Sequence, residues 1–302
     1  MRRLAGFVIV LMCTLLALPL AADQGPYPKT EEEIQAAYDA LHWDSGAGSY
    51  KLPASHAVIQ LRAGQALLLG ADAERYSWLA SGVEFPGTEA VLTYESSNAN
   101  ETYSEVYYEW RDEGYINDSD WADVDGEELL TQYRDATEAS NEERVANGFK
   151  PMQVVGWLEP PHYDKSSQTV TYALELKDED SSWANAVALR LGRAGYTELT
   201  WVGSIEAFRS AASRPALLND ALAVHSFEEG HRYADFKEGD KVAAYGIAGL
   251  VATALGVKFG KGIIAALIAF LIAGKKVVIP AVLVFGAGIV TAVRRFFGRR
   301  DA

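Results

Sequence analysis

The sequence predicts an α+β fold, with a largely antiparallel sheet and several amphipathic helices, followed by one or more C-terminal membrane helices. Three observations support this prediction. Between residues 23 and 240, runs with the period-two alternation of strands are joined by short polar turns, which favours antiparallel neighbours. Helical runs fall between groups of strands, without the regular alternation of a parallel sheet. From residue 241 onward, charged residues become rare and apolar runs dominate.

The first 22 residues match a secretory signal peptide. Two arginines precede an apolar run, and Ala21 and Ala22 provide small residues for cleavage. A leucine stands where a further small residue is preferred, so an uncleaved N-terminal anchor is the alternative. The only cysteine, Cys13, lies in the apolar run, and cleavage would leave a mature chain with no thiol and no disulfide.

The exported domain, residues 23–240, begins with a helix at Thr30, where Thr30 and Glu33 form a capping box. A second helix covers 71–81 and ends at Gly82. Strand-like runs precede and follow this second helix, and they are 49–52, 56–61, 65–70, 90–95 and 104–116.

Asp125 opens the longest helix, with Glu128 completing a second capping box, and Asn147 and Gly148 end it. The segments that follow are mostly strands with alternating apolar residues, over 152–161, 168–177, 183–193 and 196–203. Helices over 205–212 and 215–223 then lead to a charged hinge in front of the membrane region.

Charge separates the exported domain from the end of the chain. Residues 23–240 contain 16 Lys and Arg against 40 Asp and Glu, whereas residues 241–302 contain 9 Lys and Arg against one Asp. An acidic surface repels nucleic acid, so we expect no nucleic-acid partner.

The membrane region, residues 241–300, contains three apolar stretches, 242–257, 262–274 and 277–293. A spanning helix needs roughly 17 to 20 apolar residues, and 277–293 reaches that length. Arginines after this stretch favour the cytoplasm, and they are Arg294, Arg295, Arg299 and Arg300. The number of crossings after the signal is therefore odd. Either one crossing is made, with the earlier stretches on the bilayer surface, or three are made. We expect a bacterial cytoplasmic (inner) membrane protein with its bulk on the extracytoplasmic, periplasmic side.

Small residues recur at every fourth position at the start of the membrane region. They are Ala244, Ala248, Ala252, Gly256 and Gly260. Such a ridge lets a second helix approach closely in lipid, which predicts a homo-oligomer or a membrane-protein partner in addition to the lipid bilayer. A helix that is rich in alanine and glycine throughout explains the same spacing.

Signatures of an enzyme are absent from the sequence, which has neither a Gly-x-Ser-x-Gly elbow nor a His-Glu-x-x-His helix. We therefore assign no catalytic residue and no cofactor. A candidate pair for proton transfer is His162 with Asp164 in "PPHYD", where Pro160 and Pro161 explain a turn without chemistry.

Two further groups resemble metal sites. In "HSFEEGH", imidazoles and carboxylates could hold a transition metal, although a solvated acidic hinge explains the same residues. These candidates are His225, Glu228, Glu229 and His231. The carboxylates of "NDSDWADVDGEE" resemble a Ca²⁺ loop, but the EF-hand register fails, because Trp121 falls at the first ligand position and Gln132 at the last.

Several segments together resemble a known family. They are "YEWRDEGYINDSDWADVDGEELL", "NGFKPMQVVGWLEPPHYD", "ALRLGRAGYTEL" and "GHRYADFKEGDKVAAYGIAGLVA", and the likeness covers roughly 27–251. In this order they are similar to an uncharacterised bacterial family of membrane-anchored proteins, a domain of unknown function. The resemblance implies an exported domain on a C-terminal membrane anchor and supplies no catalytic residues.

Two functions are compatible with these observations. The first is a non-enzymatic interaction or binding module, anchored in the membrane. The second is an exported hydrolase or metal-dependent enzyme that uses His162 with Asp164, or His225 with His231.

Overall fold

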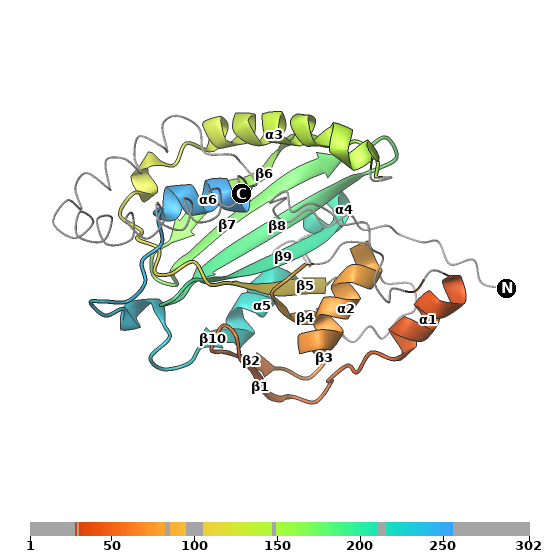
Figure 1. The fold of residues 1–302 in the computed structure, drawn as a ribbon, viewed down its shortest axis with the longest axis horizontal. Helices are drawn as coiled ribbons and strands as arrows, with labels where there is room; N and C mark the ends of the chain where they lie inside the picture. Colours follow the sequence, from red (N-terminus) through yellow and green to blue (C-terminus); the bar gives the residue numbers. More distant parts are fainter. Residues whose placement is uncertain are drawn as a thin grey trace, which may run out of the picture. The chain divides into compact units, whose positions relative to one another are not determined.

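The computed structural model describes residues 28, 30–81, 85–94, 105–146, 149–209 and 216–255, which belong to one compact unit (Figure 1). The unit is α+β with antiparallel sheets, as the sequence predicts. In chain order its elements are α1 (Glu31–Asp39), β1 (Gly48–Leu52), β2 (Ala57–Leu61), β3 (Gln65–Leu69), α2 (Gly70–Ser81), β4 (Thr88–Tyr94), β5 (Glu105–Arg111), η1 (Trp121–Asp123), α3 (Gly126–Ala146), β6 (Gln153–Asp164), β7 (Thr169–Lys177), β8 (Ser182–Leu191), β9 (Tyr196–Ser204), α4 (Ile205–Arg209), α5 (Ala216–Val224), β10 (His225–Phe227), η2 (Tyr233–Asp235) and α6 (Ile247–Ala254).

The main sheet has seven antiparallel strands in the order β3-β4-β5-β9-β8-β7-β6. It consists of two meanders, β3 to β5 and β6 to β9, which meet where β5 pairs with β9. That pairing runs from Val106 opposite Trp201 to Arg111 opposite Tyr196. The last strand of each meander therefore lies in the centre of the sheet.

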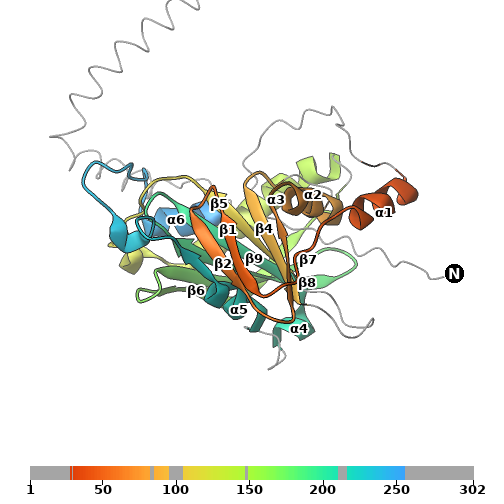
Figure 2. The same ribbon diagram turned by 90° about the horizontal axis from the view of Figure 1, so that it is seen from below.

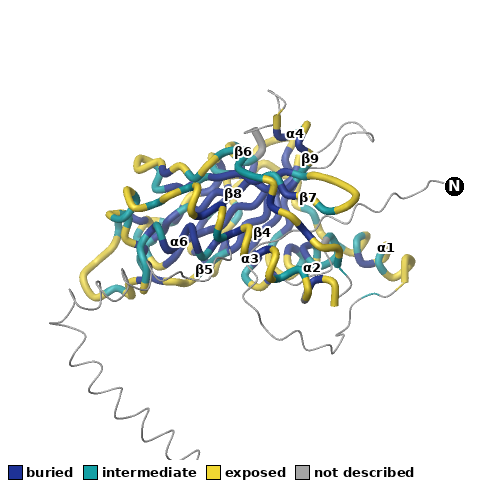
Figure 3. Tube along the Cα trace, turned by 90° about the horizontal axis from the view of Figure 1, so that it is seen from above, coloured by how far each residue is buried: buried dark blue, intermediate teal, exposed yellow. Residues whose placement is uncertain are grey.

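Different layers cover the two faces of the main sheet. The helices α2, α3 and α6 lie over one face (Figure 3), and the small sheet β1-β2-β10 lies with α5 over the other (Figure 2). The larger apolar core lies under the small sheet, where Leu52, Ile59 and Phe227 belong to one cluster with Leu199 and Trp201. The sheet is thus buried on both faces.

Both predicted helix caps are present at the expected residues. Thr30 accepts from Glu33 N at 3.2 Å and Glu33 Oε2 accepts from Thr30 N at 3.1 Å, which confirms the first capping box. Asp125 Oδ1 accepts from the N–H groups of Glu127 and Glu128, and so caps α3. The Glu128 carboxylate instead accepts a hydrogen bond from Gln132 Nε2 one turn further along α3, so Asp125 caps the helix but the second predicted capping box is not completed.

The "PPHYD" segment is not a turn, because Pro160 and Pro161 lie inside β6. The pairing of β6 with β7 is irregular at these residues, and β6 is the last strand of the sheet. A proline lacks a backbone donor, and an irregular edge strand is where a sheet tolerates that loss.

Side chains from α3 occupy part of the β6 edge. Asn141 donates from Nδ2 to Met152 O at 2.9 Å and accepts from Met152 N at 2.8 Å, as a neighbouring strand would. Arg134 donates from Nε to Val154 O at 3.2 Å. These contacts cover backbone groups that would otherwise offer a template for another strand.

Residues 241–255, which the sequence assigns to the membrane region, pack on the acidic domain in the structure. Ile247, Leu250 and Val251 of α6 are fully buried. None of the helices within the described residues combines the length and the hydropathy that crossing a bilayer requires. The predicted signal peptide, the predicted span 277–293 and the arginines after it lie outside the described residues, so the membrane assignment remains a prediction.

Candidate functional site

Segments from three of the four quoted motifs meet at one end of the main sheet. They are residues 111–120 after β5, the β8–β9 turn 192–195, and residues 228–246 between β10 and α6 (left in Figure 1). We call these three segments together the clasp. The clasp holds the residues that precede α6 in the sequence against the sheet. It is the candidate functional site.

Arg193 of the β8–β9 turn ties both ends of the long clasp segment to the sheet. Its guanidinium donates from Nε and Nη2 to the two Asp240 oxygens, each at 2.7 Å, and from Nη1 to Gly230 O at 3.0 Å. This planar fork fits a carboxylate in a way that a lysine cannot. Hydrogen bonding from Arg193 lowers the pKa of Asp240 to about 2, so Asp240 is ionised at neutral pH.

A stack of three aromatic rings fills the centre of the clasp. Tyr115 lies between Tyr233, at a centroid distance of 4.5 Å, and Phe236, at 4.1 Å. The Tyr233 hydroxyl donates to Ile116 O at 2.9 Å. On the backbone, Tyr115 N donates to Lys241 O at 2.8 Å, in a short parallel bridge. Backbone and ring contacts therefore fix the same residue.

Glycine is required where this backbone approaches closely. Gly114 has φ of 93°, and a Cβ there would lie 2.8 Å from Lys241 O. A Cβ on Gly246 would lie 2.3 Å from Asp120 Oδ2. The glycines of "DEGY" and "AAYG" thus allow two chain segments to touch.

Asp120 caps α6 from a distant part of the sequence. Its Oδ1 accepts from Ile247 N at 2.9 Å, 127 residues further along the chain. Burial raises the pKa of Asp120, although the hydrogen bonds from the helix N-terminus oppose that shift. An anionic side chain at a helix N-terminus satisfies an otherwise unpaired donor and interacts favourably with the helix dipole.

The carboxylates considered for Ca²⁺ are thus largely acceptors for protein donors. Asp118 accepts from the Tyr163 hydroxyl at 2.8 Å, while Asp120 and Asp125 cap helices. Within the described part of the chain, no group of three or more His, Cys, Asp or Glu is arranged to hold a metal ion.

His162 and Asp164, the predicted proton-transfer pair, lie on β6 and are both exposed. Asp164 accepts from the hydroxyls of Ser166 and Ser167 at 2.7 and 2.8 Å, and these bonds lower its pKa to about 2. The Asp164 carboxylate therefore orders the β6–β7 turn, and among the described residues no hydrogen bond or ion pair joins it to His162.

The "HSFEEGH" residues are not brought together, and the segment is not a solvated hinge. β10 pairs with β2, His225 opposite Ile59, which buries the His225 ring. Burial lowers the pKa of His225 to about 3. His231 instead stacks on His56, at a centroid distance of 3.9 Å.

The two glutamates of this segment also point to separate surroundings. Glu228 pairs with Lys51 Nζ at 3.0 Å, and Glu229 is exposed. Alternation and spacing in the sequence did not reveal that β10 adds to the small sheet, because three residues are too few to show a period.

The predicted ridge of small residues is divided by the fold. Ala244 is exposed and precedes α6, Ala248 is half-buried, and Ala252 is buried within the acidic domain. Gly256 and Gly260 lie outside the described residues. The role of the ridge in helix packing remains a prediction.

The structure contains a buried pair of glutamates that the sequence did not predict. Glu109 on β5 lies directly opposite Glu198 on β9, and their exposed fractions are 0% and 1%. Arg111 hydrogen-bonds to Glu109 and places Nε 4.0 Å from Glu198 Oε2. Burial raises the pKa of Glu109 despite Arg111. Charged residues that alternate in "EVYYEWR" indicate a solvated strand face, and the helices over that face cannot be seen in the pattern.

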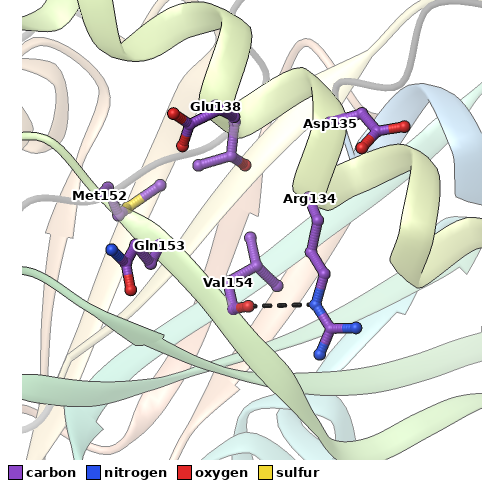
Figure 4. Close-up of a pocket in the computed structure, with 7 residues that line it drawn as sticks. Arg134, Asp135, Glu138, Met152, Gln153 and Val154 are labelled. Carbon is purple, nitrogen blue, oxygen red and sulfur yellow. Dashed lines mark hydrogen bonds between the residues drawn. The ribbon is translucent and has the colours of Figure 1, made fainter.

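A shallow depression of about 300 Å³ lies between α3 and β6 (Figure 4). Arg134, Asp135 and Glu138 line it from the helix, and Met152 to Val154 line it from the strand. Because Arg134 is bonded to the strand backbone, the depression is part of the covered edge of the sheet. None of the predicted catalytic or metal-ligating residues lines it.

The fold and the clasp define a two-sided α+β domain in which α6, the last helix of the described residues, is held to the sheet. A family model described as "Protein of unknown function (DUF2167)" matches residues 44–286, and the chain therefore belongs to this family. The predicted resemblance to an uncharacterised family is confirmed to that extent.

A search of curated proteins found no match. Among solved structures, the solution structure of cyanobacterial PsbP (CyanoP) from Synechocystis sp. PCC 6803 matches with 9% identity and a TM-score of 0.35. The match covers 70% of this chain and 99% of that chain. A likeness of this degree carries no argument about function.

Proposed function

We propose that this protein is a membrane-anchored, extracytoplasmic interaction module of a bacterial inner membrane. The observation that carries the proposal is the clasp, which fixes residues 228–246 immediately before the cationic, apolar end of the chain. The clasp would set the point at which the chain leaves the acidic domain toward its proposed anchor. Partners would be the lipid bilayer together with a second copy of the chain or another membrane protein.

The enzymatic alternative, an exported hydrolase or metal-dependent enzyme, has less support. Asp164 is occupied by two serine hydroxyls, and His225 is enclosed in the apolar core, so the proposed partners are not positioned for proton transfer. Metal analysis of the purified chain and a hydrolase screen test this alternative. A bound metal ion, or a hydrolase activity that disappears in His162→Ala or His225→Ala, would support it.

Location is tested by labelling cysteines in intact cells with a membrane-impermeant thiol reagent, in a Cys13→Ser background. Val145→Cys reports the acidic domain, because Val145 is 56% exposed on α3. Asp301→Cys is the matched reporter at the other end of the chain. We expect labelling of Val145→Cys in intact cells and of Asp301→Cys only after lysis. The reverse pattern, or recovery of the chain in a detergent-free high-salt supernatant, contradicts the proposal.

The interaction role is tested separately by crosslinking and pull-down from a detergent extract. We expect either a crosslinked species larger than the monomer or a specific co-purifying membrane protein. A strictly monomeric chain with no partner would contradict an interaction module while leaving its membrane location intact.

A further inference from the structure

Two histidines connect the small sheet to the clasp by stacking their rings. The His56 and His231 centroids are 3.9 Å apart, and the planes are inclined by 20°. His56 ends the turn between β1 and β2, is exposed, and has φ of 52°, a conformation that costs energy for a residue with a side chain. His231 is half-buried in the first turn of residues 228–246.

Backbone hydrogen bonds converge on the same contact. Glu228 N donates to His56 O at 2.8 Å, His231 N to Glu228 O at 3.0 Å, and Arg193 N to His231 O at 3.0 Å. A change in the spacing of the two rings would therefore strain the backbone hydrogen bonds that join the β1–β2 hairpin, the 228–232 turn and the β8–β9 turn.

The charged groups around the stack do not offer a free counterion. Glu228 pairs with Lys51, and Asp235 accepts from two backbone N–H groups of the same turn. The Arg193 guanidinium adds positive charge. Burial is the largest cause that lowers the pKa of His231, and His56 and Arg193 lower it further. Glu228 and Asp235 oppose that shift.

We propose that the His56–His231 stack is an acid-operated release for the 228–232 turn, closed while at most one ring is protonated and open when both are. A neutral ring can stack on a cationic one, but two cations at this separation repel each other. Histidine is the side chain that gains charge in mildly acidic water. The physiological setting rests on the proposed function: on the extracytoplasmic side of the membrane, the turn would be exposed to the pH of the medium.

The release would be local. The Asp240 carboxylate, with a pKa of about 2, remains ionised in mild acid, so its ion pair with Arg193 persists. The turn would open while the rest of residues 228–246 stays in place.

Hydrogen exchange of the full-length chain in detergent, measured between pH 7.5 and pH 5.0 and corrected for intrinsic rates, tests the proposal. Repulsion of two unit charges 3.9 Å apart in water corresponds to an opening equilibrium that rises about sixfold. We expect protection of the 228–232 amides to fall toward that factor as the pH is lowered, while β8 and β9 remain protected.

Matched variants test whether the two stacked histidines cause the pH response of this turn. In His56→Gln and in His231→Gln the protection of this turn should no longer depend on pH, whereas His162→Gln, which changes an exposed histidine on β6, should respond like the wild type. A wild-type turn that does not respond to pH overturns the proposal, and so does a response that survives in His56→Gln. Each variant is compared with itself across pH, so a general loss of stability does not mask the result. The measurement is also independent of where the protein is located, so its failure is distinguishable from failure of the membrane assignment.

Discussion

The contact between Gly246 and Asp120 makes a strong prediction about coupling. An added Cβ on Gly246 would lie 2.3 Å from Asp120 Oδ2 and 2.5 Å from both Oδ1 and Cγ. Gly246 has φ of −91° and ψ of −164°, which an alanine adopts without backbone strain. The cost of Gly246→Ala therefore comes from the collision with the carboxylate that caps α6.

The size of the coupling free energy follows from the collision of the added Cβ with Asp120 and from the Asp120 cap of α6. Overpacking of this kind costs about 1–3 kcal/mol. Loss of the Asp120 cap in Asp120→Ala costs about 1 kcal/mol, within a range of about 0.5–2 kcal/mol. In Asp120→Ala the obstructing atoms are gone, so adding Gly246→Ala should be neutral or stabilising by up to about 1 kcal/mol, because alanine restricts the unfolded chain. The two substitutions should therefore be non-additive by about 2 kcal/mol.

A double-mutant cycle on the full-length chain in detergent measures this coupling. All seven tryptophans lie between residues 43 and 201, so tryptophan fluorescence during urea unfolding reports on the folded unit. Additive effects within about 0.5 kcal/mol would refute the contact and the assignment of Asp120 as the cap of α6.

Three further substitutions test other parts of the account. Burial raises the pKa of Glu109, so its contribution to stability is full below its unfolded pKa and is lost as pH rises through its folded pKa; unfolding midpoints from pH 5 to pH 9 should fall less in Glu109→Gln than in wild type, and parallel curves would contradict a raised pKa of Glu109. Arg193→Lys keeps the charge but loses the fork to Asp240, so endoproteinase cleavage after Lys237 should become faster, and an unchanged rate would show that the fork does not restrain the loop. Arg134→Ala uncovers carbonyls at the β6 edge and should promote oligomers in size-exclusion chromatography with light scattering, whereas an unchanged elution profile would show that this edge is protected by other groups.

Local signals in the sequence predicted local structure well. The helix starts at Thr30 and Asp125 follow from side chains that hydrogen-bond to backbone groups two or three residues away. The strands β7, β8 and β9 follow from alternation over nine or ten residues, and antiparallel pairing follows from the short turns between them. These features depend on neighbours in the sequence.

The site depends on contacts that no local pattern contains. Asp120 and Ile247 are 127 residues apart, and Arg193 and Asp240 are 47 apart. The motif residues were identified by resemblance, but their convergence was visible only in the fold. A run of small apolar residues such as 247–254 has the same composition whether it is buried in a protein core or in lipid, so composition alone assigned α6 to the membrane.

The central claim is that residues 228–246 fold back onto residues 111–120, in a domain that we propose lies on the extracytoplasmic side of the membrane. Tyr115 and Val242 are bridge partners in the clasp, and neighbouring strands place residues within the range that a disulfide can join. Tyr115→Cys with Val242→Cys, in a Cys13→Ser background, should form an intramolecular disulfide in cells, seen as a mobility shift on non-reducing gels that neither single variant shows, since the proposed extracytoplasmic compartment is oxidising. If both thiols remain free in cells and also after a mild oxidant is added to the purified chain, the clasp does not exist as described.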